Sequence, residues 1–244
     1  SHMKTQLIFL LGFAFLLTQC GNKKEQTVAE SNDGTQWTWL FDGSSTEKWR
    51  DIKSEEFPEQ GWVVNNGVLT VLGKTDEHSG GRDIITKNRY GNFELELDVN
   101  LTEGANSGIK YQVTDSFPGN EGKFLGLEYQ LLDNDIHPDA HEGRDGNHKM
   151  AALYDVMPPV EDLTIHPPGE WNKVRIVLDG NTIEHWLNDE KALEIDRKSY
   201  AFKELVGLSK YKDLENFAEL DQGRILLQGH GNDVSFRNIK IRTW

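Results

Sequence analysis

Apolar and polar residues alternate strictly over residues 93–101, where Phe, Leu, Leu, Val and Leu take every second position and acidic or amide residues lie between them. Successive side chains of a β-strand point to opposite faces, so this pattern predicts a strand with one face on a core. Residues 127–132 alternate in the same way. Leu127, Tyr129 and Leu131 would face the core, and Glu128 and Gln130 would present a carboxylate and an amide on the other face.

Two turn motifs predict tight hairpins. Asn65-Asn66-Gly67 lies between the apolar runs 62–64 and 68–71, and Asp179-Gly180-Asn181 lies between 171–178 and 182–188. Asn and Gly tolerate the positive φ angles that two-residue hairpin turns need. Each motif therefore predicts an antiparallel pair of strands.

Further strands and one helix complete the predicted secondary structure. The strands are expected at 37–41, 83–87, 109–113, 224–228 and 234–242, with another beginning at 151–155. Residues 200–211 are the segment whose apolar pattern favours a helix. Many short strands separated by turns, with almost no helix, predict an all-β sandwich of antiparallel sheets in one domain spanning 37–244.

The first twenty residues have the form of a bacterial lipoprotein signal behind a short tag remnant, Ser1-His2. Lys4 supplies a basic residue, and residues 7–17 are an apolar run too short to span a bilayer comfortably. We expect Cys20, the single cysteine of the chain, to be lipidated after cleavage, and no disulfide can form within the chain. Residues 21–36 are polar and are expected to form a linker. The localisation predicted is a periplasmic or cell-surface lipoprotein that meets the membrane only through this lipid anchor.

The charge balance excludes one class of partner. Lys and Arg number 26 against 40 Asp and Glu, a formal net charge of -14. So acidic a surface repels polyphosphate, and we therefore expect no binding to nucleic acid.

A polar loop after the strand at 127–132 concentrates side chains that transfer protons or bind metals. His137, Asp139, His141, Glu142 and His148 all lie within it. His137 and Asp139 could ligate a divalent metal ion, the one possible cofactor that the sequence suggests. The alternative is a solvated loop whose acids form Asx-turns. Residue types alone leave both interpretations open.

Short sequence segments spread along the chain resemble those of a known family. They are LFDGSSTEKW at 40–49, GWVVNNGVL at 61–69, YGNFELELDV at 90–99, GANSGIKYQV at 104–113, GLEYQLLDN at 126–134, ALYD at 152–155, GEWNKVRIVLDGNTIEHWLND at 169–189 and VSFRNIKIR at 234–242. Together they resemble the 3-keto-disaccharide hydrolase family, over nearly all of the chain from Trp37 onward. The resemblance implies a concanavalin A-like jelly roll of two antiparallel sheets. It also implies an extracytoplasmic enzyme that acts on glycosides already oxidised at sugar C3.

The implied chemistry is mild. A ketone at C3 acidifies the C2 proton, so a base can remove it, the C1 substituent can leave by β-elimination, and added water makes the net reaction a hydrolysis. This needs a base, a stabiliser for the enolate oxygen and an acid for the leaving group. We expect Glu128, Asp133 and His137 in the acid and base roles. Lys149, Tyr154 or a metal ion would stabilise the enolate.

A jelly roll also implies a concave sheet face that suits an extended sugar. Side chains on the polar faces of neighbouring strands would line it, and we expect Lys110, Gln112 and Gln130 there. Further candidate contacts are Asn134, Arg82 in a glycine-rich loop, and His230, whose flanking glycines permit close approach of a ligand. The expected partner is an oxidised disaccharide or another 3-keto-glycoside.

Two other functions fit the same fold. Many glucanases carry Glu-x-Asp-x-Glu or Glu-x-Asp-x-x-Glu on one strand, whereas here Gln130 takes the place of the middle acid, which counts against ordinary glucanase chemistry. The alternative from a different class is a non-catalytic carbohydrate-binding module or lectin. Such a protein needs stacking aromatics and amides more than titratable groups, so the loop at 133–148 favours the enzyme.

Two further groups of titratable residues are expected to be structural. Glu94, Glu96 and Asp98 share one strand face, which we interpret as a solvated outer face. His185 lies inside the predicted strand at 182–188, where a hydrogen-bonded sheet histidine is expected.

Overall fold

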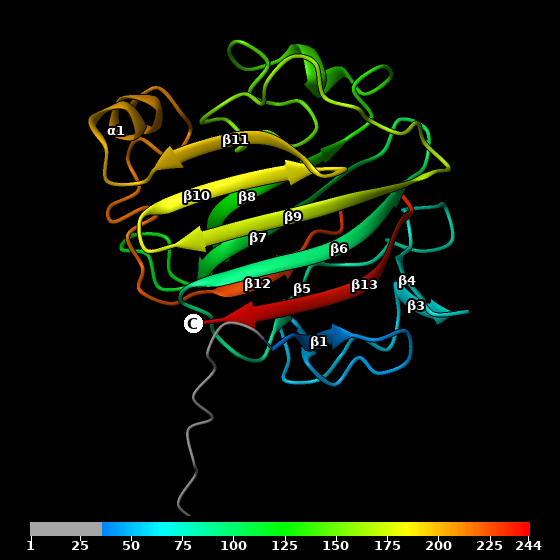
Figure 1. Cartoon of the computed structure of the whole chain (residues 1–244). Coiled ribbons are helices and arrows are strands. Elements are labelled where there is room, and N and C mark those ends of the chain that lie inside the picture. The colour runs from blue at the N-terminus through cyan, green and yellow to red at the C-terminus, as the bar shows by residue number, and fades with distance from the viewer. Residues whose placement is uncertain (1–35) are drawn as a thin grey trace, which may run out of the picture. The chain divides into compact units, whose positions relative to one another are not determined.

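The computed structural model describes residues 36–244, whose strands form two antiparallel sheets (Figure 1). The larger sheet has eight strands in the order β11-β10-β9-β6-β13-β4-β3, with β1 also paired to β13. Their bounds are β1 (Thr38–Phe41), β3 (Trp62–Asn65), β4 (Val68–Val71), β6 (Phe93–Leu101), β9 (Trp171–Asp179), β10 (Thr182–Leu187), β11 (Glu190–Asp196) and β13 (Val234–Thr243). Several strands that are neighbours in this sheet are far apart in the sequence, because the chain crosses to the other sheet between them.

The smaller sheet has five strands in the order β2-β5-β12-β7-β8. Their bounds are β2 (Trp49–Asp51), β5 (Ile84–Thr86), β12 (Arg224–Leu227), β7 (Asn106–Thr114) and β8 (Leu125–Leu132). One α-helix, α1 (Tyr200–Gly207), and one short 3-10 helix, η1 (Pro138–His141), lie in the connections of the described residues. The predicted sandwich of two antiparallel sheets is confirmed.

The core lies between the two sheets and follows the alternating pattern. Leu95, Leu97 and Val99 of β6 are almost fully buried, as are Leu127 and Tyr129 of β8. Fully burying such a side chain stabilises the fold by about 1.5–3 kcal/mol. Alternation therefore leaves the outer face of each sheet free for polar residues.

The outer face of β6 carries ion pairs rather than freely solvated acids. Glu94 contacts Arg175 and Arg242, and the next two acids of the strand pair with Lys240 and Arg237. The acids do point away from the core, as predicted, but Glu94 is only 6% exposed because the arginines cover it.

Both predicted hairpins are confirmed. Asn66 and Gly67 have φ angles of 49° and 78° between β3 and β4, and Gly180 has a φ of 58° between β9 and β10. The helix is shorter than the predicted 200–211. It begins after Ser199, whose hydroxyl accepts a hydrogen bond from the Phe202 backbone, and it ends at Gly207, which helix propensity disfavours.

The prediction that a strand begins at 151–155 is wrong. Ala151 and Asp155 have φ angles of 70° and 61°, left-handed conformations that interrupt an extended chain. The segment instead lies along the edge of β8, where its backbone exchanges hydrogen bonds with Gln130 and Glu128. It thereby covers an edge that would otherwise expose unpaired backbone groups.

The remaining N-terminal predictions concern residues outside the described part of the chain. These are the tag remnant and signal peptide at 1–20, the lipidated Cys20 and the linker at 21–36, of which only the last residue is described. Within residues 36–244, no helix is both long and apolar enough to cross a membrane.

Candidate active site

A small pocket of about 90 Å³ opens on the outer face of the smaller sheet. Register brings its strand residues together, because Lys110 of β7 lies directly opposite Glu128 of β8, and Gly108 lies opposite Gln130. Strand β12 pairs with the other edge of β7 and leads into the turn that carries Gln228 and His230. We call this the Glu128 pocket; it is lined by Asn106, Lys110, Glu128, Gln130, Tyr154, Lys210, Gln228 and His230.

Gly108 leaves the space that the Glu128 carboxylate occupies. A Cβ atom at residue 108 would lie 2.2 Å from Glu128 Oε1, far inside van der Waals contact. The glycine of β7 therefore determines where the carboxylate of β8 can lie. Among the described residues no side chain or backbone group donates a hydrogen bond to this carboxylate, so its oxygens remain free to accept a proton from a bound molecule.

Burial raises the pKa of the Glu128 carboxyl above its usual value. The positive charges of Lys110 and Lys210 act in the opposite direction and favour the ionised form, Lys110 more strongly, whereas Asp83 adds to the rise. A carboxylate with a raised pKa is a stronger base than an exposed one. The pocket thus combines a basic carboxylate with two ammonium groups.

Tyr154 and Lys210 reach the pocket from loops. The backbone N–H of Tyr154 donates to the carbonyl of Glu128 at 2.9 Å, so the loop along β8 carries the tyrosine beside the carboxylate. Its hydroxyl donates to Asp139 Oδ2 at 3.1 Å. Burial, and then the negative charge of Asp139, raise the pKa of Tyr154 well above its usual value, so the phenol stays neutral.

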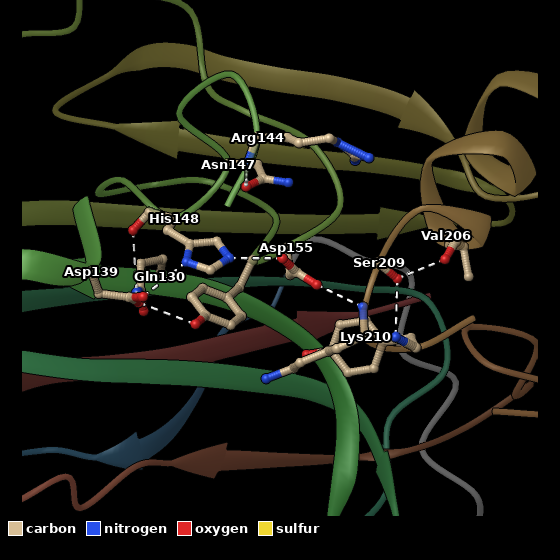
Figure 2. Close-up of polar contacts among 11 residues, drawn as sticks. Gln130, Asp139, Arg144, Asn147, His148, Asp155, Val206, Ser209 and Lys210 are labelled. Carbon is tan, nitrogen blue, oxygen red and sulfur yellow. Dashed lines mark hydrogen bonds and ion pairs between the residues drawn. The ribbon is translucent and has the colours of Figure 1, made fainter. Parts of the chain in front are cut away.

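His148 lies between two carboxylates at the back of this loop. Its Nδ1 is 2.9 Å from Asp139 Oδ1 and its Nε2 is 2.7 Å from Asp155 Oδ1 (Figure 2). Because both ring nitrogens face acceptors, both donate when the imidazole is protonated. We call these three residues the His148 clamp.

Two of the three predicted acid–base residues do not line the Glu128 pocket. Asp133 uses its carboxylate to accept hydrogen bonds from the backbones of Gly104 and Asp135, an Asx-turn that anchors the loop. His137 precedes η1 and accepts a hydrogen bond from the Asp139 backbone. The side chains that converge with Glu128 are instead those of Lys110, Lys210 and His230.

Of the predicted substrate contacts, some line the Glu128 pocket and others do not. Lys110, Gln130, Tyr154 and His230 line the pocket, whereas Asn134 and Lys149 line a different hollow. Gln112 is 2% exposed in an irregular part of β7, with a φ of 54°, and it accepts a hydrogen bond from Arg197. An irregularity in register redirects side chains, so the alternation that placed Gln112 beside Lys110 fails there.

Arg82 and the predicted metal pair also lie apart from the pocket lining. Arg82 makes two hydrogen bonds to the buried Asp51 at the edge of a larger hollow of about 700 Å³. Asp139 is engaged by His148, Gln130 and Tyr154. Across residues 36–244, no three His, Cys, Asp or Glu side chains are grouped so that they could hold a metal ion.

The sequence interpretation missed several residues that the fold brings to this region. Asn106, Lys210 and Gln228 line the pocket, and Asp155 supports its loop; His148 was named as a member of the polar loop, but no role was predicted for it. The turn from Gln228 to His230 could have suggested Gln228. No local pattern marks Lys210, which lies in a short turn after α1.

Two antiparallel sheets with a pocket of amides, lysines and one buried carboxylate on the smaller sheet define a jelly-roll protein with a candidate site for a small polar ligand. The chain belongs to the 3-keto-alpha-glucoside-1,2-lyase-like domain family, whose model matches residues 36–242. The predicted family resemblance is confirmed.

Known relatives agree with this assignment. The chain is 35% identical over 231 residues to a protein of Bacteroides thetaiotaomicron named 3-keto-disaccharide hydrolase, covering 86% of this chain and 79% of the relative. A crystal structure of a candidate glycosyl hydrolase from Parabacteroides distasonis superposes with a TM-score of 0.73 at 27% identity, covering 89% of this chain and 98% of that one. A second candidate glycosyl hydrolase from the same organism has a TM-score of 0.66 at 30% identity, covering 86% and 100%.

A more distant structure shares the fold alone. An inactivated β-agarase B bound to agaro-octaose superposes with a TM-score of 0.53 at 11% identity, covering 85% of this chain and 93% of the agarase. Family and relatives together identify the chain as a carbohydrate-active hydrolase, which confirms the prediction of an enzyme over a lectin.

Proposed function

We propose that the protein cleaves glycosides that are already oxidised at C3 of the sugar, and that the Glu128 pocket is its active site. Support comes from the family and from the name of the Bacteroides thetaiotaomicron relative. The observation that carries the proposal is the buried carboxylate of Glu128, with its raised pKa, beside Lys110 and Lys210.

The pocket fits this chemistry better than ordinary glycoside hydrolysis. Ordinary retaining and inverting glycosidases use two carboxyl groups on either side of the scissile bond. Glu128 is the one carboxylate among the residues that line the described pocket. A single base opposed by cations suits removal of an acidified proton and stabilisation of an enolate.

The proposed reaction begins at C2. Glu128 removes the C2 proton, and the electron pair of that bond forms the enolate, whose negative C3 oxygen is stabilised by the ammonium groups of Lys110 and Lys210. The pair returns to expel the C1 oxygen, which takes a proton from His230 as the C1–O bond breaks. Water then adds to C1 and gives its proton to His230, while Glu128 returns its proton to C2. The products are the 3-keto sugar and the free alcohol.

The test is turnover of a 3-keto-glucoside and of its unoxidised parent by the wild type and by Glu128→Gln, each with and without chelator. We expect cleavage of the keto substrate only, reduced by at least about 10²-fold in Glu128→Gln, because general-base catalysis contributes about 10²–10⁴-fold. Inhibition by the chelator would add a metal requirement.

Glu103→Gln is the matched control, since Glu103 is an exposed glutamate in the turn between β6 and β7. It should retain wild-type activity. Cleavage of the parent as fast as the keto substrate, or full activity in Glu128→Gln, would overturn the proposal.

A further inference from the structure

The residues that line the Glu128 pocket come from two kinds of segment, strands and the connections between elements. Glu128, Lys110 and Gln130 are held by the register of β7 and β8. Tyr154 and Lys210 come from connecting segments, and Lys210 is exposed and has a long, flexible side chain. A long side chain loses rotamer freedom when it is held in one place, so a catalytic role for Lys210 requires contacts that position it.

The His148 clamp supplies those contacts. Asp155 binds the His148 ring through Oδ1 and accepts a hydrogen bond from the backbone N–H of Lys210 through Oδ2 at 2.7 Å (Figure 2). One carboxylate therefore ties the loop along β8 to the turn that follows α1. Ser209 strengthens that turn, because its hydroxyl donates to the Val206 carbonyl and accepts from the Tyr211 backbone.

The other side of the clamp holds Tyr154. Asp139 Oδ1 lies 2.9 Å from His148 Nδ1, and Asp139 Oδ2 accepts a hydrogen bond from the Tyr154 hydroxyl. The His148 ring also stacks on the Tyr154 ring, with centroids 4.3 Å apart. The ammonium of Lys210 in turn lies 4.5 Å from the centroid of the Tyr154 ring, a distance at which a cation is attracted to an aromatic face.

We propose that the His148 clamp is a positioning unit that fixes Lys210, through the Asp155 bond to its backbone and the Tyr154 ring beneath its ammonium, as the second cation that stabilises the enolate. Lys210 would be a catalytic residue in contact with the enolate oxygen. Asp139, His148 and Asp155 would act through Lys210 and Tyr154 without touching the substrate. The inference rests on the proposed function.

The first measurement is the steady-state kinetics of Lys210→Met and Lys210→Arg on a 3-keto-glucoside. We expect Lys210→Met to lower kcat by about 10²-fold, the loss typical of removing one oxyanion-stabilising group, with KM changed less than threefold. Lys210→Arg, which keeps the charge, should recover part of kcat. Lys203 is an exposed lysine of α1, so Lys203→Met is the control and should keep the wild-type kcat and KM. Full kcat in Lys210→Met would overturn the assignment.

The second measurement is a double-mutant cycle that tests the clamp. Asp155→Asn keeps the size of the side chain but replaces one acceptor oxygen by an amide, which cannot accept from both His148 and Lys210. It should lower kcat about tenfold in the wild type and less than twofold in Lys210→Met, because residues that act through one another are not additive. His148→Gln should lower kcat by similar factors in the same two backgrounds. This second variant keeps the test decisive if Asp155→Asn folds poorly.

A purely structural clamp gives a different result. Equal losses of kcat in both backgrounds, or a lower melting temperature with unchanged kcat, would overturn the inference. A wild type that cleaves no 3-keto-glycoside would instead overturn the proposed function. An active wild type with additive effects would overturn the positioning role alone.

Discussion

At the scale of single residues, the pairing of Glu128 with Lys110 determines the chemistry of the pocket. The two residues lie directly opposite each other in the β7–β8 ladder. Burial favours the protonated carboxyl, and the lysine charge favours the ionised one. The balance between these effects sets the pH above which Glu128 can act as a base.

Lys110→Met should move the acid limb of the pH–rate profile upward. In the wild type the limb is expected above pH 4.5, the usual pKa of a glutamate, because burial raises the pKa of Glu128. Among the neighbouring charges, that of Lys110 lowers this pKa most, so its removal raises the pKa further and delays ionisation to higher pH. The measurement is kcat/KM against pH for both proteins; a limb that moves to lower pH in Lys110→Met would contradict the assignment.

Gly108→Ala should lower activity strongly while the sheet persists. The added methyl would lie 2.2 Å from Glu128 Oε1, so the carboxylate must move. We expect at least about a 10²-fold loss of kcat, since small displacements of catalytic groups have effects of this size. Activity and circular dichroism check the prediction. Gly207→Ala in α1, where an added Cβ meets nothing within 4 Å, should keep full activity.

At the scale of elements, one buried histidine joins both sheets to the loop along β8. His185 of β10 is fully buried; its Nε2 lies 2.8 Å from the Tyr111 hydroxyl of β7 and its Nδ1 lies 3.0 Å from the Ala151 carbonyl. In the neutral ring, Nδ1 donates to Ala151 and Nε2 accepts from Tyr111. The predicted hydrogen-bonded sheet histidine is thus confirmed. It also holds the segment that carries Tyr154.

Protonation of His185 should destabilise the fold in acid. Burial lowers the pKa of His185 from 6.5 to about 4, so between these values the unfolded chain binds a proton that the folded chain does not. The neutral His185 therefore makes its full contribution to stability above pH 6.5. As the pH drops to about 4, the free energy of unfolding falls by up to about 3 kcal/mol.

Urea unfolding at several pH values checks this prediction. The dependence on pH between 6.5 and 4 should be weaker in His185→Gln, although that variant is less stable at every pH. His141→Gln, at an exposed position, should keep the wild-type slope. An equal slope in His185→Gln and the wild type would show that another group is responsible.

At the scale of the whole molecule, the described residues are an acidic sandwich with a locally cationic pocket. The chain has a formal net charge of -14, yet Lys110 and Lys210 oppose one carboxylate in the Glu128 pocket. Such local charge suits a reaction that develops an anion on a neutral sugar. The enzyme class follows from the family, and the pocket suggests how that class works here.

The extracytoplasmic location remains a prediction of the N-terminal residues. If Cys20 is lipidated, the protein should partition into the membrane fraction and be released by Cys20→Ala, since the lipid chain supplies the membrane affinity. Fractionation of cells that express the natural precursor, with and without this substitution, measures the effect. Equal partitioning of both forms would argue against the lipid anchor.

Much of the fold and part of the candidate site could be predicted because their signals are local. Alternation along residues 93–101 and 127–132 predicted strands with one buried face, and the Asn-Gly and Asp-Gly turns predicted the hairpins. The same alternation assigned Glu128 and Gln130 to the polar face of β8. It failed at Gln112, where an irregularity in β7 changes the side-chain direction, and at 151–155, where positive φ angles interrupt the chain.

The amino-acid sequence by itself therefore determined the sandwich, the family and the polar face of β8, because side-chain period and turn chemistry act over a few residues. Only the tertiary structure decided which polar side chains converge. Lys210 lines the same pocket as Glu128 and lies in a turn after α1 that the Asp155 carboxylate binds. The side chains of Asp133 and His137, nearer along the chain, accept hydrogen bonds from the backbone of the turn before β7 or of their own loop. Convergence depends on loop contacts between distant segments, and no periodic pattern records them.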